Sequence, residues 1–330
     1  MGEEARFDLP VGITVDSAGV IYVVDQFDST VRSITPDAVV TTLETRSMDA
    51  GSADQIMPSP RLNHPSGIAV DCSGSLYIAD TGNNTIRKLA PDGSMTTFAG
   101  ESGIPGLAEG QGAAARFNSP LGIAVDLDGN VYVADQGNLK IRKITADGSV
   151  TTIADVAGDP GGPNGSGALT QVSFPAGLAV DDGGNLYFAD RNNSIIREID
   201  TYGNVSTVAG VAGAYGSADG ACADALFDFP VGLAVAPTGV VYVADTSANT
   251  IRLVRGSVPQ PPMLRLKIVS GQIMVCWPAS ATGWVLQSRS DLSPNRNWAP
   301  VPTAPVVQGC NFVVTTTLQT PAAFFRLQHQ

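Results

Sequence analysis

Aspartates recur along most of the chain at intervals of 55 residues: Asp25, Asp80, Asp135, Asp190 and Asp245. Carboxylate oxygens suit Ca²⁺, which takes six to eight oxygen ligands. Four of the five are therefore candidate metal ligands: Asp80, Asp135, Asp190 and Asp245. A residue that every copy of a repeat carries is expected to serve the repeat itself. We therefore favour a structural role, in which each carboxylate accepts hydrogen bonds from nearby backbone amides.

His64 breaks this regularity. It precedes the proline of the second copy, at a position where the other copies carry Leu, Ser or Phe. The only other histidine, His329, lies outside the repeats, so His64 is the one candidate imidazole base for activating water there. A lone histidine in a loop is more often a plain surface residue. Two histidines cannot furnish a three-histidine metal site.

Further polar side chains follow the repeated aspartates and form a predicted ligand-binding rim. Its candidate residues are Asp28, Asn84, Asn138, Lys140, Arg191, Asn193 and Asn249. The oxygen donors among them suit calcium, whereas Lys140 and Arg191 could meet an anionic ligand. Asparagine is also a common turn residue. The segment 126–130 has the start of a calcium loop but lacks the distal glutamate, and a hairpin turn explains it better.

The elements that must position these residues belong to a repeat. The pattern Pro-x-Gly-(Ile/Leu)-(Ala/Thr)-Val begins at five positions: Pro10, Pro65, Pro120, Pro175 and Pro230. Tyrosine and arginine columns keep the same register. In the second copy, β-prone segments 67–70, 76–79, 85–89 and 94–99 are separated by polar turns and loops, which predicts four short strands, and 100–119 is predicted to be an ordered long loop. Four strands repeated radially predict a five-bladed β-propeller.

Two copies resemble the NHL repeat. They read PSGIAVDCSGSLYIADTGNNTIRKLAPDGSMTTFAG, from Pro65 to Gly100, and PLGIAVDLDGNVYVADQGNLKIRKITADGSVTTIA, from Pro120. The resemblance covers residues 7 to about 258 and implies the β-propeller fold. NHL proteins include ligand-binding scaffolds, RNA-binding modules and a few enzymes, so the resemblance leaves the function open.

Two functions compete. The first is a binding module that takes a small molecule or a protein at the rim, and the repetition, the long loops and an appended domain favour it. The second is a Ca²⁺-dependent hydrolase of small lactones or esters. The chain is similar, at the level of fold, to propeller lactonases of the gluconolactonase and paraoxonase types, which hold one calcium in the central channel to polarise a lactone carbonyl.

The propeller is predicted over residues 1–258, a proline-rich linker over 259–263 and a small β-sandwich-like domain over 264–330. This last segment resembles the small β-sandwich appended to bacterial surface proteins. Its candidate strands are 264–269, 272–277, 284–288, 312–317 and 324–327. The fifth repeat lacks a fourth strand, so either 264–269 completes it or the C-terminal region builds a further blade. Cys276 and Cys310 either form a disulfide or are two buried thiols.

Composition excludes several classes of protein. The net charge is −12 with only 19 lysines and arginines, which argues against a partner made of nucleic acid, because phosphate binding needs cationic side chains. No apolar run approaches the roughly 20 residues that span a bilayer. No signal peptide precedes the first repeat, and an extracytoplasmic location fits a longer precursor.

Overall fold

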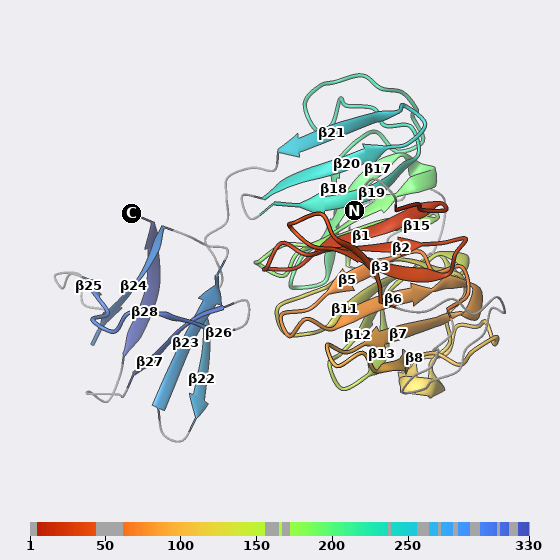
Figure 1. Ribbon diagram of the computed structural model, residues 1–330. Helices are drawn as coiled ribbons and strands as arrows, with labels where there is room; N and C mark the ends of the chain where they lie inside the picture. Colours follow the sequence, from red (N-terminus) through yellow and green to blue (C-terminus); the bar gives the residue numbers. More distant parts are fainter. Residues whose placement is uncertain are drawn as a thin grey trace. The chain divides into compact units, whose positions relative to one another are not determined.

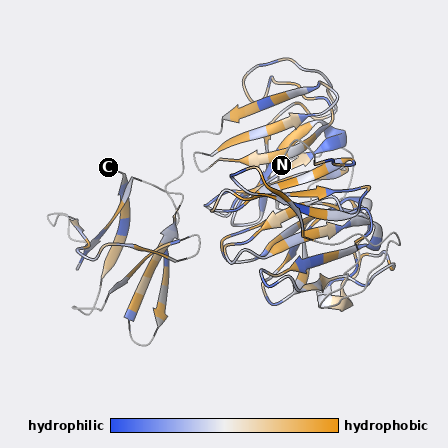
Figure 2. Cartoon of the chain, viewed as in Figure 1, coloured by the Kyte–Doolittle hydropathy of each residue, from blue (hydrophilic) through white to orange (hydrophobic). Residues whose placement is uncertain are grey.

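The computed structural model describes residues 5–43, 62–155, 165–166, 172–236, 239–255, 264–269, 272–279, 283–290, 298–308, 311–316 and 323–329. The chain divides into two compact units, Met1–Ser257 and Val258–Gln330. Both are built from antiparallel strands (Figure 1), and hydrophobic residues concentrate on those strands (Figure 2). The predicted all-β fold, a repetitive propeller followed by a smaller β domain, is confirmed.

Five sheets form the blades of the first unit (Figure 1). The first blade comprises β1 (Pro10–Val15), β2 (Ile21–Asp25), β3 (Thr30–Ile34) and β4 (Val40–Thr42). The second comprises β5 (Ile68–Val70), β6 (Leu76–Asp80), β7 (Thr85–Leu89) and β8 (Met95–Ala99). The third comprises β10 (Pro120–Val125), β11 (Val131–Asp135), β12 (Lys140–Ile144) and β13 (Ser149–Ala154). The fourth comprises β15 (Pro175–Val180), β16 (Leu186–Asp190), β17 (Ile195–Ile199) and β18 (Asn204–Ala209), and the fifth β19 (Pro230–Val235), β20 (Val240–Asp245) and β21 (Thr250–Arg255).

The long loops between blades contribute short elements of their own. β9 (Gly110–Gln111) pairs with β13 and β14 (Gly165–Ser166) pairs with β18, so each adds a fifth strand to the outer edge of the blade that follows it. A 3₁₀ turn, η3 (Gly112–Ala114), follows β9. Similar turns follow the second strands of three blades: η2 (Thr81–Asn83), η4 (Gln136–Asn138) and η6 (Arg191–Asn193).

An aspartate closes the turn between the first two strands of a blade. Asp71 Oδ1 accepts hydrogen bonds from the backbone N–H groups of Ser73 and Ser75 at 2.8 and 2.9 Å, and the Tyr77 hydroxyl donates to Oδ2 at 3.3 Å. Asp126 does the same in the third blade, where the Tyr132 hydroxyl donates to it at 3.0 Å. The tyrosine column thus braces this turn, and 126–130 is a hairpin turn, as expected.

In the first four blades, the glycine of the Pro-x-Gly pattern lets neighbouring first strands approach closely. A Cβ atom on Gly122 of β10 would lie 2.0 Å from the carbonyl oxygen of Ala176 at the start of β15, and one on Gly67 would lie 2.3 Å from the carbonyl oxygen of Leu121. Such distances exclude any side chain. Gly232 of β19 is different, because its Cβ would meet only the Cβ of Ala244 in its own blade, at 3.3 Å.

Four apolar clusters fill the interfaces between successive blades. They join blades 1 and 2, 2 and 3, 3 and 4, and 4 and 5. In the cluster between blades 2 and 3, Tyr77, Ala79 and Ile86 pack with Ile123 and Val133. Among the residues that the structure describes, no such cluster joins blade 5 to blade 1. We call the region between these two blades the seam.

The second unit packs two sheets around its own core. One sheet has the order β22 (Arg265–Val269), β23 (Gln272–Pro278), β27 (Asn311–Thr316), β26 (Val306–Gln308), and the other β25 (Ala299–Pro300), β24 (Trp284–Arg289), β28 (Phe324–His329). Val275, Trp277 and Val314 of the first sheet meet Leu286 of the second. All five strands expected from the sequence are present, together with β25 and β26, which are short.

The structure excludes one alternative in each of two questions that the sequence left open for this segment. β22 pairs with β23 inside the second unit, so residues 264–269 do not complete the fifth blade. Cys276 is half-buried and forms no disulfide, so it is not bonded to Cys310, which lies outside the described residues. Cys222 is free and exposed.

Candidate functional site on the propeller rim

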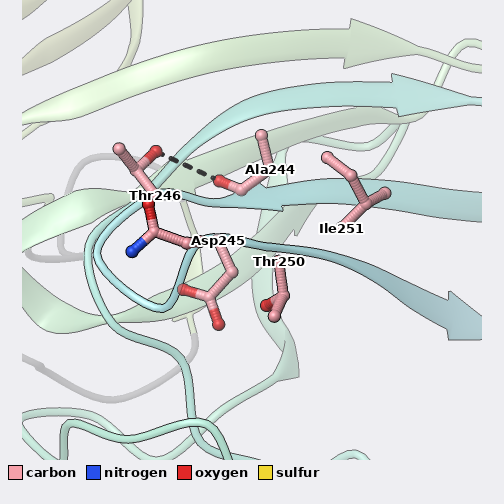
Figure 3. Close-up of a pocket in the computed structure, with 6 residues that line it drawn as sticks. Ala244, Asp245, Thr246, Thr250 and Ile251 are labelled. Carbon is pink, nitrogen blue, oxygen red and sulfur yellow. Dashed lines mark hydrogen bonds between the residues drawn. The ribbon is translucent and has the colours of Figure 1, made fainter.

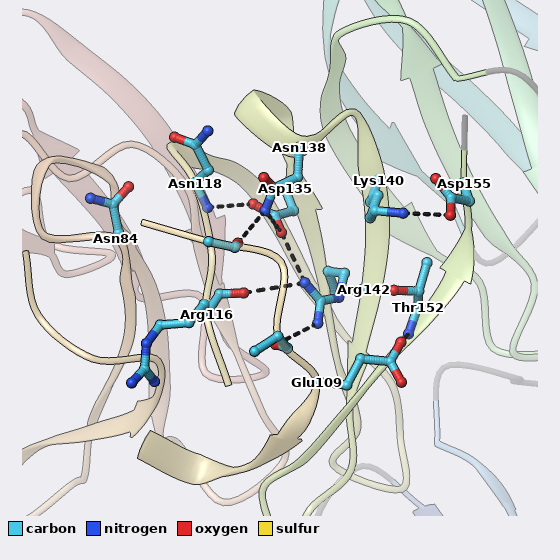
Figure 4. A network of polar contacts seen from close by, with 12 residues as sticks. Asn84, Glu109, Arg116, Asn118, Asp135, Asn138, Lys140, Arg142, Thr152 and Asp155 are labelled. Atoms are coloured by element: carbon cyan, nitrogen blue, oxygen red, sulfur yellow. Dashed lines mark hydrogen bonds and ion pairs between the residues drawn. The ribbon is translucent and has the colours of Figure 1, made fainter. Parts of the chain in front are cut away.

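The repeated aspartates are buried and accept hydrogen bonds from the residues around them. Asp135 Oδ1 accepts a hydrogen bond from the backbone N–H of Asn118 at 2.7 Å, while Oδ2 accepts from the Asn138 side chain at 2.7 Å and from the Arg142 guanidinium at 3.1 Å (Figure 4). Each carboxylate therefore ties the loop before its blade to the end of the second strand. The other four repeated aspartates accept an equivalent backbone bond at 2.7 Å: Asp25, Asp80, Asp190 and Asp245.

Burial perturbs the acidity of these carboxyl groups. Removal from water raises the pKa of Asp80 to about 6 and that of Asp190 to about 6, and the hydrogen bonds from Asn83 and Asn193 lower each pKa only in part. The pKa of Asp135 is raised for the same reason. A carboxylate in a dry site is costly unless donors surround it, and here the donors come from the same blade.

The arginine column completes this network. Arg142 is wholly buried and donates to the carbonyl oxygens of Arg116 at 3.2 Å and Ala108 at 3.1 Å, besides Asp135, with its guanidinium 5.4 Å from the centre of the Phe117 ring (Figure 4). The repeated Asp–Arg pair thus fastens the preceding long loop to the blade.

The outer surface of this region is the rim. It consists of the loops between second and third strands together with the residue that precedes the proline of each first strand. These pre-proline residues are Leu9, His64, Ser119, Phe174 and Phe229, and all have a left-handed backbone, with φ between 46° and 60°. Neighbouring blades are linked here: the Ser119 N–H donates to Asn84 Oδ1 at 2.8 Å, and the His64 N–H to Ser29 Oγ at 3.2 Å.

His64 lies at the rim and is exposed. Its Nδ1 is 2.8 Å from Asn63 Oδ1, and its ring meets the Phe27 ring edge to face with centroids 6.4 Å apart. Neither of these neighbours is a carboxylate that could orient a catalytic base. The assignment of His64 as a base stays a prediction.

The structure distributes the predicted rim ligands among several roles. Asn138 and Asn193 point inward to the buried aspartates, and Lys140 is paired with Asp155. Asn84 accepts the bond from the next blade, and Asp28 is half-buried at the first rim loop. Asn249 is exposed and helps line a shallow hollow of ≈ 220 Å³ on the fifth blade, with Ala244, Asp245, Thr246, Thr250 and Ile251 (Figure 3).

Aromatic residues are the rim feature that the sequence analysis did not single out. Phe27 is 60% exposed, Phe174 42% and Tyr215 53%. Tyr215 stacks on Phe229 with centroids 5.5 Å apart, and the Arg191 guanidinium lies 5.6 Å from the centre of the same Phe229 ring. The repeat could have indicated these aromatic residues, because Phe174 and Phe229 occupy the same pre-proline position as His64.

No assembled metal site is found in the part of the chain that the structure describes: no group of three or more His, Cys, Asp or Glu side chains is placed to hold an ion. Within the same residues, no helix has the length and hydropathy needed to cross a membrane.

Comparisons with known proteins agree with this architecture. The family model for the NHL repeat matches residues 62–89, 117–144 and 227–252, in the second, third and fifth blades. The chain therefore contains NHL repeats, and its first unit has the β-propeller fold.

Relatives share this repeat over part of their length. The chain is 37% identical over 148 residues to Protein SUPPRESSOR OF QUENCHING 1, chloroplastic, of Arabidopsis thaliana, which spans 41% of this chain and 14% of that protein. It is 26% identical over 288 residues to NHL repeat-containing protein 2 of Bos taurus, which spans 76% of this chain and 39% of that protein. A crystal structure of an auxiliary nutrient binding protein from Bacteroides ovatus is similar with a TM-score of 0.57 at 16% identity, over 76% of this chain and 60% of that one. The chain thus spans well under half the length of both sequence relatives.

Proposed function

We propose that the propeller is a binding module that takes a protein or small-molecule partner on its rim. One observation carries the proposal: aromatic side chains stand exposed on loops whose repeated polar groups are already engaged inside the blades. Exposed aromatics on rigidly held loops are costly to keep in water and are enriched at binding surfaces.

The rim also offers an attachment point for an anionic group. The Arg191 guanidinium lies over the Phe229 ring, and Tyr215, which stacks on the same ring, is fixed by the hydrogen bond from its hydroxyl to the Asn192 carbonyl oxygen at 3.1 Å. Arginine stacked on an aromatic ring can still donate to a carboxylate. The partner expected here presents apolar or aromatic groups beside a negative charge.

The experiment pans a random peptide library displayed on phage against the immobilised chain. Peptides that bind are then titrated against three single variants, Phe27→Ser, Phe174→Ser and Tyr215→Ser, and against Tyr202→Ser as control. Tyr202 is exposed on an outer turn of the fourth blade, away from the rim. We expect at least one rim variant to weaken binding about tenfold, the range of an interface anchor, and the control to leave it unchanged. Peptides whose binding is weakened equally by Tyr202→Ser, or by none of the variants, would refute the proposal that the rim is the binding surface.

The Ca²⁺-dependent hydrolase stays a prediction, with His64 as its candidate base and Asp80, Asp135, Asp190 and Asp245 as its candidate ligands. A panel of lactones and esters tests it: hydrolysis that EDTA abolishes and Ca²⁺ restores would establish the hydrolase, and turnover unaffected by His64→Ala would remove that residue from it.

A further inference from the structure

The first and last blades leave uncovered the faces that the middle blades bury. Ile13 of β1 is 70% exposed, whereas its equivalent Ile123 in β10 is 6% exposed. Ile251 of β21 is 74% exposed, whereas its equivalent Ile141 in β12 is fully buried. Large aliphatic side chains thus face water on both sides of the seam, and covering them would be favourable because it removes apolar surface from water.

The two uncovered faces are the two halves of an interface that the chain already builds. We define the tail face as Ala234, Tyr242, Ala244 and Ile251 of blade 5. Its residue types are identical to those that blade 2 presents to blade 3, namely Ala69, Tyr77, Ala79 and Ile86. We define the head face as Ile13, Ile21, Val23 and Ile34 of blade 1, of which Ile13 is exposed, Ile21 and Ile34 are half-buried and Val23 is buried. It corresponds to the residues with which blade 3 meets blade 2, namely Ile123, Val131, Val133 and Ile144.

Polar groups at the seam match in the same way. Asn249 occupies the loop position of Asn84, whose Oδ1 accepts the Ser119 N–H of the next blade at 2.8 Å. Leu9 occupies the position of Ser119. Asn249 instead donates from Nδ2 to the Ser247 carbonyl oxygen of its own loop at 3.3 Å. It lines the ≈ 220 Å³ hollow drawn in Figure 3 together with Ala244 and Ile251 of the tail face.

We propose that the tail face of one copy of this chain docks the head face of a second copy, so that blade 1 of the second copy follows blade 5 of the first. A second copy is the occupant because it carries the complementary half, in the residue types and register of the four existing interfaces. The contact is head to tail. It uses a different surface on each copy and can therefore continue from copy to copy unless the rotation closes a ring.

The experiment is sedimentation velocity over a concentration series, with single variants that block one face each. Ile13→Asp blocks the head face and Ile251→Asp blocks the tail face. Both residues are exposed within one copy, so the substitutions leave its core intact. Tyr202→Asp adds the same charge at an exposed position outside the seam and is the control. The wild type and the control are expected to rise above the 34.0 kDa chain mass with concentration, and each blocked variant to stay at it.

A mixture of the two blocked variants gives the decisive readout. Ile13→Asp keeps an intact tail face and Ile251→Asp keeps an intact head face, so an equimolar mixture should form a dimer, about a twofold rise in mass, and grow no further. Three outcomes overturn the proposal. They are a wild type that is monomeric at every concentration, single variants Ile13→Asp and Ile251→Asp that each still associate, and an equimolar mixture of these two variants that stays monomeric.

Discussion

In the second, third and fourth blades a polar network joins the blade to the residues that precede its first strand. Asp135, Arg142 and Asn138 surround the backbone N–H of Asn118 in the third blade, and the asparagine recurs as Asn83 and Asn193, whereas the first and fifth blades carry Asp28 and Ala248 at this position. Because the carboxylate is fully buried, its charge is tolerated only through these donors. The residues that look most reactive in the sequence therefore hold the loops in place, and the rim surface is left to residues that vary between copies.

The raised pKa values predict a pH dependence of stability. Asp80 and Asp190 have a pKa of about 6 in the folded chain against an ordinary value of 3.8. Their protonated forms are favoured by folding, so their contribution is fully present below about pH 4 and is lost as the pH rises through 6. For one such group, the free energy of unfolding should be about 1 kcal/mol higher at pH 5 than at pH 7.

Urea unfolding followed by circular dichroism at pH 5, 6 and 7 measures this contribution. Asp80→Asn removes one titrating group, so its free energy of unfolding should change less between pH 7 and pH 5 than that of the wild type. The control is Asp92→Asn. Hydrogen bonds from Ser94 lower the pKa of this exposed carboxyl, so it titrates below the window. If the free energy of unfolding of Asp80→Asn changed with pH as much as that of the wild type, Asp80 would not be protonated in this pH range.

At the scale of strands, the sequence predicted most of the propeller because each strand is short, β-prone and bounded by an Asp-Gly turn. Most copies carry a tyrosine at the position of Tyr77 together with an aspartate at the position of Asp71, and the hydrogen bond between these two side chains explains why they occur together. Three features were beyond such reasoning. The pairing of β9 with β13 joins two residues of a long loop to a distant edge. The left-handed φ of the pre-proline residues has no residue-type signature, since Leu9 and Phe174 share it. The uncovered faces at the seam depend on the packing of whole blades.

Glycine positions in the first strands give a matched test of blade packing. A Cβ atom on Gly122 would overlap the Ala176 carbonyl oxygen at 2.0 Å, so Gly122→Ala should force neighbouring strands apart and lower the free energy of unfolding by about 2–3 kcal/mol. Gly232→Ala meets only a Cβ at 3.3 Å, and the expected change is within about 1 kcal/mol.

Thermal and urea unfolding of the two variants at low protein concentration makes this comparison. Dilution keeps the seam uncovered, so the result reports packing within one copy. Equal losses in both variants would mean that another strand packs on β19 in the dilute protein.

At the scale of the whole molecule, the two units have separate cores and very different sizes. The smaller one is organised around Val275, Trp277, Leu286 and Val314, whereas the propeller has four clusters between its blades. A unit of this size buries a smaller share of its surface and is correspondingly less stable. We expect the second unit to unfold at a lower urea concentration than the propeller.

Intrinsic probes separate the two transitions without any substitution. All three tryptophans, Trp277, Trp284 and Trp298, lie in the second unit, and Trp277 is almost completely buried. Tryptophan fluorescence should therefore report the first transition, and far-ultraviolet circular dichroism mainly the second. Coincident midpoints from the two probes would indicate a single cooperative unit instead.

Each polar network is confined to one blade and the loop that precedes it, and this also bears on how such a chain can grow. A duplicated segment made of a blade and its preceding loop brings the donors and acceptors of that network, and it presents a Tyr-Ala-Ile surface to the blade that follows it. Tandem gene duplication can therefore add one complete blade at a time to the array. The sequences of the rim loops can then change while the strands that carry them stay the same.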